Sequence, residues 1–104
     1  HVGNVTLVDS ESGTQIWYEG CPQKLKCVTS PARPVPIIQW FPEPNNATNA
    51  NITNKNITNT NGLVVTESEI TIIPKRDQIY SIYCAGNIEG QQAVNSTIVE
   101  IYVL

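Results

Sequence analysis

Residues 27–40 read CVTSPARPVPIIQW, a stretch that begins at Cys27 and ends at Trp40, and a further cysteine, Cys84, follows 57 positions after the first. Both ends of this stretch lie in runs of β-branched and apolar residues. The three prolines between them cannot stand in a central β-ladder. The stretch is therefore expected to fold as a strand, a loop and a second strand, with Cys27 in the first strand and Trp40 in the second.

The rest of the chain has the same character. Apolar and polar residues alternate, turn-forming residues recur at roughly 8–12 positions, and no segment has the 3.6-residue period of a helix, which is typical of an all-β protein. A length of 104 residues predicts one domain spanning residues 1–104. Strands are expected at Asn4–Val8, Gln15–Tyr18, Lys24–Thr29, Ile37–Phe41, Leu63–Thr66, Glu69–Ile73, Ile79–Ala85 and Thr97–Leu104.

Asparagine is concentrated in the middle third of the chain. The segment from about 45 to 62 is almost entirely asparagine and threonine, so it is expected to be an exposed loop. Asn-x-Ser/Thr triplets, the acceptor sites for N-linked glycans, are in excess over the chain and argue for the secretory pathway. Their asparagines are Asn4, Asn46, Asn51, Asn56 and Asn95.

Charge and hydropathy exclude several classes of function. The net charge is −3, and the few charged residues are scattered, so no basic nucleic-acid footprint is present and no nucleic-acid partner is expected. No apolar run approaches the roughly 20 residues that span a bilayer, and no amphipathic helix or signal-peptide pattern is found. We therefore expect a mature ectodomain module without direct membrane contact, with any anchor outside this segment.

Four stretches together carry a resemblance to a known family. They are EGCP at 19–22 with LKC at 25–27, IQWF at 38–41, ITI at 70–72 and CAGNIEG at 84–90. These motifs resemble those of the immunoglobulin superfamily, and more narrowly its intermediate (I-set) type from cell-surface adhesion and recognition receptors. The resemblance covers nearly the whole chain.

The resemblance implies a fold and a set of structural residues. The fold would be an immunoglobulin-like β-sandwich of two antiparallel sheets with Greek-key connections and seven to eight strands. Cys27 and Cys84 would form the disulfide between the sheets, and Trp40 would pack on it in the core. The localisation would be extracellular, as the ectodomain of a single-pass membrane protein or as a secreted protein, with neighbouring ectodomains as further partners.

Cys21 makes the cysteine count odd. In a secreted chain an odd cysteine indicates a bridge to another chain or domain, a quiet thiol, or a non-native pairing, and the sequence leaves these three open.

Catalytic chemistry finds no support in the residue pattern. The single histidine is His1, at the terminus, and the carboxylates are spread along turns and strands. There is no glycine-rich phosphate loop and no ligand set for zinc. The expectation is a protein that is not an enzyme and that uses no catalytic residue, metal or cofactor.

Strand alternation predicts one candidate binding face. If Trp40 and Cys84 point inward, then Phe41, Tyr83 and Tyr102 point outward on strands that are neighbours in the resembling fold. Outward aromatic residues are enriched at protein interfaces, although they also serve as ordinary cross-strand pairs. The expected face consists of Gln39, Phe41, Tyr83, Glu100 and Tyr102. The glycan sites are expected to leave bare either this face or the loop tip formed by Arg33–Pro36 and Asn87–Gln91.

The resulting hypothesis is an extracellular domain that mediates cell–cell adhesion or recognition by binding a protein, with homophilic binding as one form. The alternatives are a ligand-binding module of a signalling receptor or secreted binder, and a passive spacer between other domains. Self-association separates the first hypothesis from the second, since a homophilic module dimerises without any other ligand.

Overall fold

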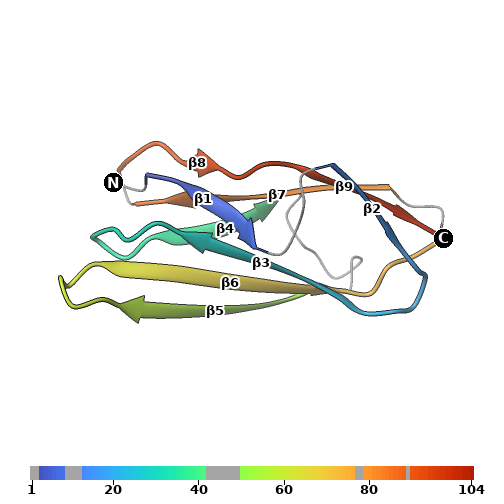
Figure 1. The fold of residues 1–104 in the computed structure, drawn as a ribbon, viewed down its shortest axis with the longest axis horizontal. Coiled ribbons are helices and arrows are strands. Elements are labelled where there is room, and N and C mark those ends of the chain that lie inside the picture. The colour runs from blue at the N-terminus through green and yellow to red at the C-terminus, as the bar shows by residue number, and fades with distance from the viewer. Residues whose placement is uncertain (1–2, 9–12, 42–49, 77–78, 89) are drawn as a thin grey trace.

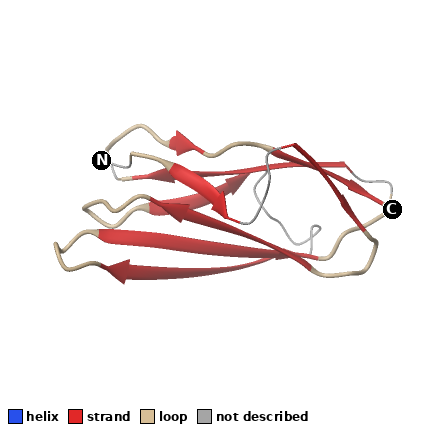
Figure 2. Cartoon of the chain, in the orientation of Figure 1, coloured by secondary structure: helices blue, strands red, loops and turns tan. Residues whose placement is uncertain are grey.

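The computed structural model describes residues 3–8, 13–41, 50–76, 79–88 and 90–104, and over these residues the chain consists of strands and loops (Figure 2). The all-β prediction is confirmed. The strands are β1 (Val5–Val8), β2 (Gly13–Trp17), β3 (Gln23–Thr29), β4 (Ile37–Phe41), β5 (Ala50–Thr58), β6 (Val64–Ile72), β7 (Ile79–Asn87), β8 (Val94–Asn95) and β9 (Val99–Val103).

The strands form two sheets, as Figure 1 shows. One sheet has the order β1-β3-β6-β5 and is called the β3–β6 sheet below. The other has the order β2-β9-β7-β4, with β8 also paired to β7, and is called the β7–β9 sheet. The predicted immunoglobulin-like β-sandwich is confirmed, and its non-consecutive neighbours, such as β3 beside β6 and β4 beside β7, are those of Greek-key connections.

One edge of the β7–β9 sheet departs from the prediction of antiparallel sheets. There β2 runs parallel to β9, with Gly13 opposite Val99 and Trp17 opposite Val103. The cause is that the N-terminal part of the chain is divided between the sheets: β1 pairs with β3 in one sheet, and β2 then joins the outer edge of the other. At that edge β2 runs in the same direction as β9, so the two strands form a parallel pair.

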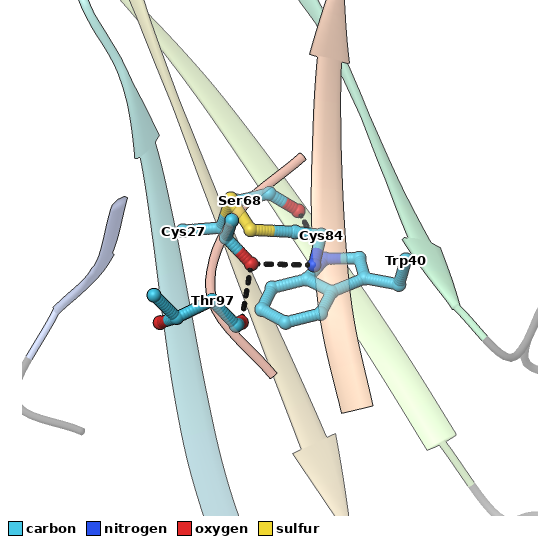
Figure 3. The surroundings of a disulfide bond; sticks show 6 residues. Cys27, Trp40, Ser68, Cys84 and Thr97 are labelled. Carbon is cyan, nitrogen blue, oxygen red and sulfur yellow. Dashed lines mark hydrogen bonds between the residues drawn. A yellow bond between two sulfur atoms is a disulfide. The ribbon is translucent and has the colours of Figure 1, made fainter. Parts of the chain in front are cut away.

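The core lies between the sheets around a disulfide. Cys27 on β3 and Cys84 on β7 are bonded with a Cα–Cα distance of 6.5 Å, and both are fully buried. The Trp40 indole lies beside this bond (Figure 3) and is 2% exposed. Its Nε1–H donates to Ser68 Oγ at 2.8 Å, which gives the one polar atom of the ring a partner where water is excluded.

The segment at 45–62 was predicted to be an exposed loop, but part of it is a strand. Residues 50–58 form β5, a nine-residue strand that pairs along its whole length with β6. The prediction was wrong here because it equated polarity with loop structure, whereas an edge strand needs only one hydrogen-bonded neighbour and tolerates polar side chains on both faces. Residues 51–58 are exposed, as expected of so polar a segment. Residues 45–49 lie outside the described part of the chain.

The two short strands expected at 63–66 and 69–73 are one continuous strand, β6. Sequence reasoning placed a break at the polar residues between them. In the structure Ser68 is buried and accepts from Trp40, and Glu67 points outward and pairs with Lys26. Thr66, just before them, is also buried and donates its hydroxyl proton to the carbonyl oxygen of Pro36 at 2.7 Å. With β5 and the short β8 added, the described residues form nine strands rather than seven or eight.

Candidate binding face

The solvent side of the β7–β9 sheet carries the candidate residues, and several large apolar side chains are exposed on it. Ile16 on β2 is 57% exposed, and its register partner on β9, Tyr102, is 40% exposed. Ile98, directly before β9, is 53% exposed because the next residue, Val99, points into the core. Ile16 and Tyr102 thus meet solvent side by side, and Ile98 meets it four residues before Tyr102.

Phe41 and Tyr83 form the second part of this face. They are register partners on the antiparallel strands β4 and β7, and their rings stack with centroids 5.1 Å apart and planes at 17°. Both side chains are partly buried. Strand alternation sets their direction, since their neighbours Trp40 and Cys84 point into the core. The structure therefore brings together the two aromatic residues that the sequence predicted on neighbouring strands.

Tyr102 does not belong to the same cluster. In the β7–β9 register it lies opposite Ile79, four residues along β7 from Tyr83, which corresponds to about 13 Å at a strand's rise per residue. The exposed pair Ser81 and Glu100 lies between them. The five predicted residues thus share one face, but the aromatic groups form two separate anchors with a carboxylate between them. Gln39, also on this face, lies opposite Ala85.

The outer face of the β3–β6 sheet is of the opposite character. Its outward side chains on β3 and β6 form two ion pairs, Lys24–Glu69 with a 3.8 Å N–O distance and Lys26–Glu67 with 3.7 Å. Lys55 on β5 lies opposite Glu67. Exposed ion pairs of this kind contribute little to stability, but they keep a sheet face soluble and unattractive to an apolar partner. The contrast singles out the β7–β9 sheet as the candidate binding face.

Sequence reasoning missed three apolar members of this face, Ile16, Ile37 and Ile98, of which Ile37 lies two residues from Gln39 on the outer side of β4. The signal was present in the strand alternation. Val99, Ile101 and Val103 alternate along the last strand and share its inward face, which turns Ile98 outward. Ile16 points outward because the next residue, Trp17, is buried. The expected face was anchored on aromatic residues, whereas aliphatic side chains at 53–60% exposure contribute equally to an apolar surface.

A β-bulge between β8 and β9 changes the position of one glycan site. On β8, Asn95 pairs with Ala85, whereas the β9 register is shifted by one residue, so that three residues, 96–98, oppose two on β7. The Ser96 side chain replaces a backbone acceptor: its Oγ accepts from the Cys84 N–H at 3.0 Å and donates to the Thr97 carbonyl oxygen at 2.9 Å. The extra residue reverses the alternation.

The reversal places Asn95 on the outer face of the β7–β9 sheet. Ala85, its register partner, follows Cys84 and lies on the outer side beside Gln39; it is 5% exposed but does not belong to the core cluster. Asn95 is exposed there, two residues along the sheet from the Phe41–Tyr83 pair. The expectation that the glycan sites leave this face bare is therefore wrong, because the Asn95 acceptor lies on it. Without the bulge, the alternation of β9 would have turned Asn95 inward.

The other glycan sites lie elsewhere on the sandwich. Asn4 precedes β1 and is exposed, and Asn51 and Asn56 are exposed on the edge strand β5. Asn46 lies outside the described residues. All the described acceptor asparagines are thus accessible, and none of the other three is on the β7–β9 sheet.

Cys21 has an exposed, unpaired thiol in the turn between β2 and β3. Its amide donates to the Tyr18 carbonyl oxygen at 3.1 Å, and the neighbouring amides of Glu19 and Gly20 donate to Leu104 and Pro74. The turn is thereby fixed at the end of the sandwich from which the C-terminus leaves, which Figure 1 marks. This position is remote from the Phe41–Tyr83 pair.

The described residues contain no group of three or more His, Cys, Asp or Glu side chains that could hold a metal ion. Among the same residues, no helix is long and apolar enough to cross a membrane.

Comparison with known proteins assigns this fold to a family. The model of the CD80-like C2-set immunoglobulin domain matches residues 5–94. This is a close variant of the I-set type that the motifs resemble. Among solved structures, the crystal structure of Rst D1-D2 superposes with a TM-score of 0.77 at 12% sequence identity, covering 99% of this chain and 49% of that one. The chain thus spans about half the length of that structure. No curated protein sequence matches.

Proposed function

Since the chain belongs to the CD80-like C2-set immunoglobulin domains, we propose that it is an extracellular recognition module that binds a protein through the outer face of the β7–β9 sheet. We further propose that the partner is a second copy of this chain on an opposed cell, so that the domain mediates adhesion. Domains of this family serve protein–protein recognition in general. The finer assignment rests on the surface described above.

The observation that carries the proposal is the contrast between the two outer faces. One exposes Ile16 and Tyr102 as one anchor and carries the stacked Phe41–Tyr83 pair as a second, while the other carries lysine–glutamate pairs. Large apolar side chains gathered on one outer face indicate an interaction site, and aromatic residues with few rotatable bonds are the usual anchors. The disulfide-bonded core holds these side chains on rigid strands, which lowers the entropy lost on binding.

A homophilic contact agrees with the composition of this face. A two-fold interface uses the same patch twice, so each residue must tolerate its counterpart. The two aromatic anchors lie on either side of Glu100 and Ser81, and a two-fold axis passing near Ser81 would bring the anchors of one copy onto those of the other. The Glu100 carboxylates of the two copies would then also lie near the axis, so the contact must keep water between them.

Sedimentation equilibrium of the secreted, glycosylated chain tests the proposal. We expect a reversible dimer that persists in reductant and that Tyr83→Ala weakens by at least about tenfold, as truncation of an interface anchor does. Ile57→Ala is the matched control, since Ile57 is 41% exposed on the outer face of the other sheet. A strict monomer, or equal effects of the two variants, would refute the homophilic assignment and leave ligand capture or a spacer role.

A further inference from the structure

A groove opens on the side of the sandwich, between the edge strands β4 and β5. It has a volume of about 190 Å³ and combines apolar and polar side chains. Two of its apolar residues meet solvent to an unusual degree, Val35 at 45% and Ile37 at 60% exposure. The lining includes Val35, Ile37, Ile38, Asn54, Asn56 and Thr66.

The edge strand β5 presents one glycan acceptor to this groove. Asn56 lies opposite Thr66, which is 3% exposed and faces the interior, so Asn56 points to the sandwich side of β5. Its Oδ1 lies 3.1 Å from the Thr66 hydroxyl oxygen, which also donates to Pro36 in the wall of the groove. Because Oδ1 is held toward Thr66, the nitrogen Nδ2, the atom that carries an N-linked glycan, is directed away from Thr66.

The same strand carries a second acceptor with the opposite orientation. Asn51 lies opposite Thr71, which alternation places with Glu67 and Glu69 on the outer face of the β3–β6 sheet. It does not line the groove. The two acceptors are thus five residues apart on one exposed strand and face opposite sides of it.

We propose that Asn56 carries an N-linked glycan whose first sugars lie in this groove and become part of the packed domain. In the attachment step, Nδ2 loses one proton and forms a bond to the anomeric carbon of an oligosaccharide. The bond that breaks joins that carbon to the diphosphate of the lipid-linked donor, and the lipid diphosphate leaves. Nδ2 keeps its second hydrogen, and Oδ1 stays available to Thr66.

The chemistry of the groove fits a sugar. A pyranose ring has C–H groups on its faces and hydroxyl groups on its rim, so it can cover exposed aliphatic side chains and still satisfy polar neighbours. Val35 and Ile37 offer the aliphatic surface, and Asn54 offers an amide at the rim. Removing this apolar surface from water favours the packed arrangement. Ile37 shares the outer side of β4 with Gln39 and Phe41, so the groove borders the β7–β9 face, but the inference holds whichever protein that face binds.

The experiment compares variants of the chain secreted from eukaryotic cells. Thr58→Ala removes the acceptor triplet Asn56-Ile57-Thr58 but keeps Asn56 and its contact with Thr66, whereas Thr58→Ser keeps the triplet. Asn51→Gln removes the other acceptor on the same strand. Peptide mass spectrometry measures the occupancy, and thermal unfolding measures the effect of each glycan.

We expect Asn56 to be occupied and Thr58→Ala to lower Tm by about 4 °C or more, while Thr58→Ser and Asn51→Gln change it by about 1 °C at most. An endoglycosidase acting on the folded chain should remove the Asn51 glycan and spare the Asn56 glycan. In chains refolded without glycans, Thr58→Ala should have the Tm of the parent, which assigns the loss to the sugar rather than to the threonine.

Three results would overturn the inference. The first is an Asn56 that is unoccupied in most molecules. The second is a Tm that falls equally for Thr58→Ala and Asn51→Gln, or for neither. The third is equal cleavage of both glycans in the folded state.

Discussion

The hydrogen bond between Trp40 and Ser68 gives the sharpest quantitative test of the core. Ser68→Ala removes one oxygen atom and leaves the Trp40 Nε1–H without an acceptor, at a site where the two residues are 2% and 1% exposed. A buried donor that loses its partner costs about 1–3 kcal/mol. We therefore expect the free energy of unfolding to fall by about 2 kcal/mol, which corresponds to a fall in Tm of about 10 °C for a domain of this size.

Chemical denaturation followed by tryptophan fluorescence measures this loss. Ser81→Ala is the matched control, because the substitution makes the same chemical change outside the core. Ser81 is an exposed serine on β7, opposite Glu100. Its effect should stay within about 0.5 kcal/mol. The denaturant dependence should be unchanged in both variants, since neither alters the surface exposed on unfolding.

The result that would refute this reasoning is a Ser68→Ala variant no less stable than Ser81→Ala. The Trp40→Phe background provides a second check. Phenylalanine has no N–H to satisfy, so in that background Ser68→Ala should cost clearly less than it does beside the native tryptophan. Equal costs in the two backgrounds would assign the loss to packing and not to the hydrogen bond.

Three further predictions concern the cysteines and one glycan. Replacing Cys27 and Cys84 together by alanine should lower the free energy of unfolding by about 4 kcal/mol in the chain-entropy account of a 57-residue loop, measured by urea denaturation; a loss below about 1 kcal/mol would contradict it. Cys21→Ser should leave Tm within about 1 °C and abolish any disulfide-linked dimer on non-reducing gels, because its thiol is exposed; a dimer that persists would exclude Cys21 as the link. Asn95→Gln should strengthen self-association in sedimentation wherever mass spectrometry finds Asn95 occupied, because its glycan lies beside the binding face; unchanged association of an occupied site would contradict this placement.

The sequence predicted the centre of the fold well because burial and covalent chemistry both constrain it. Cys27, Trp40 and Cys84 could occupy only inward positions on their strands once the motifs were recognised. Their outward neighbours Phe41 and Tyr83 then followed from the two-residue period of a strand. The structure places these five side chains as the alternation predicts.

The parts that the sequence did not predict are those where no burial pattern exists or where the period is broken. β5 carries no apolar alternation, and its structure depends on pairing with β6 rather than on its own side chains. The bulge at Ser96 depends on a side chain that replaces a backbone acceptor, and nothing in the alternation of β9 announces it. The orientation of Asn95 could therefore be read only from the register of both strands.

The most direct test of the binding face is hydroxyl-radical footprinting of the glycosylated chain over a range of concentrations that spans its self-association. We predict that Tyr83 and Tyr102 become protected from oxidation as the concentration rises, while Ile57 on the opposite sheet keeps its reactivity. Protection of Ile57 instead, or no change at Tyr83 and Tyr102 while a dimer forms, would contradict the assignment of the β7–β9 sheet as the recognition surface.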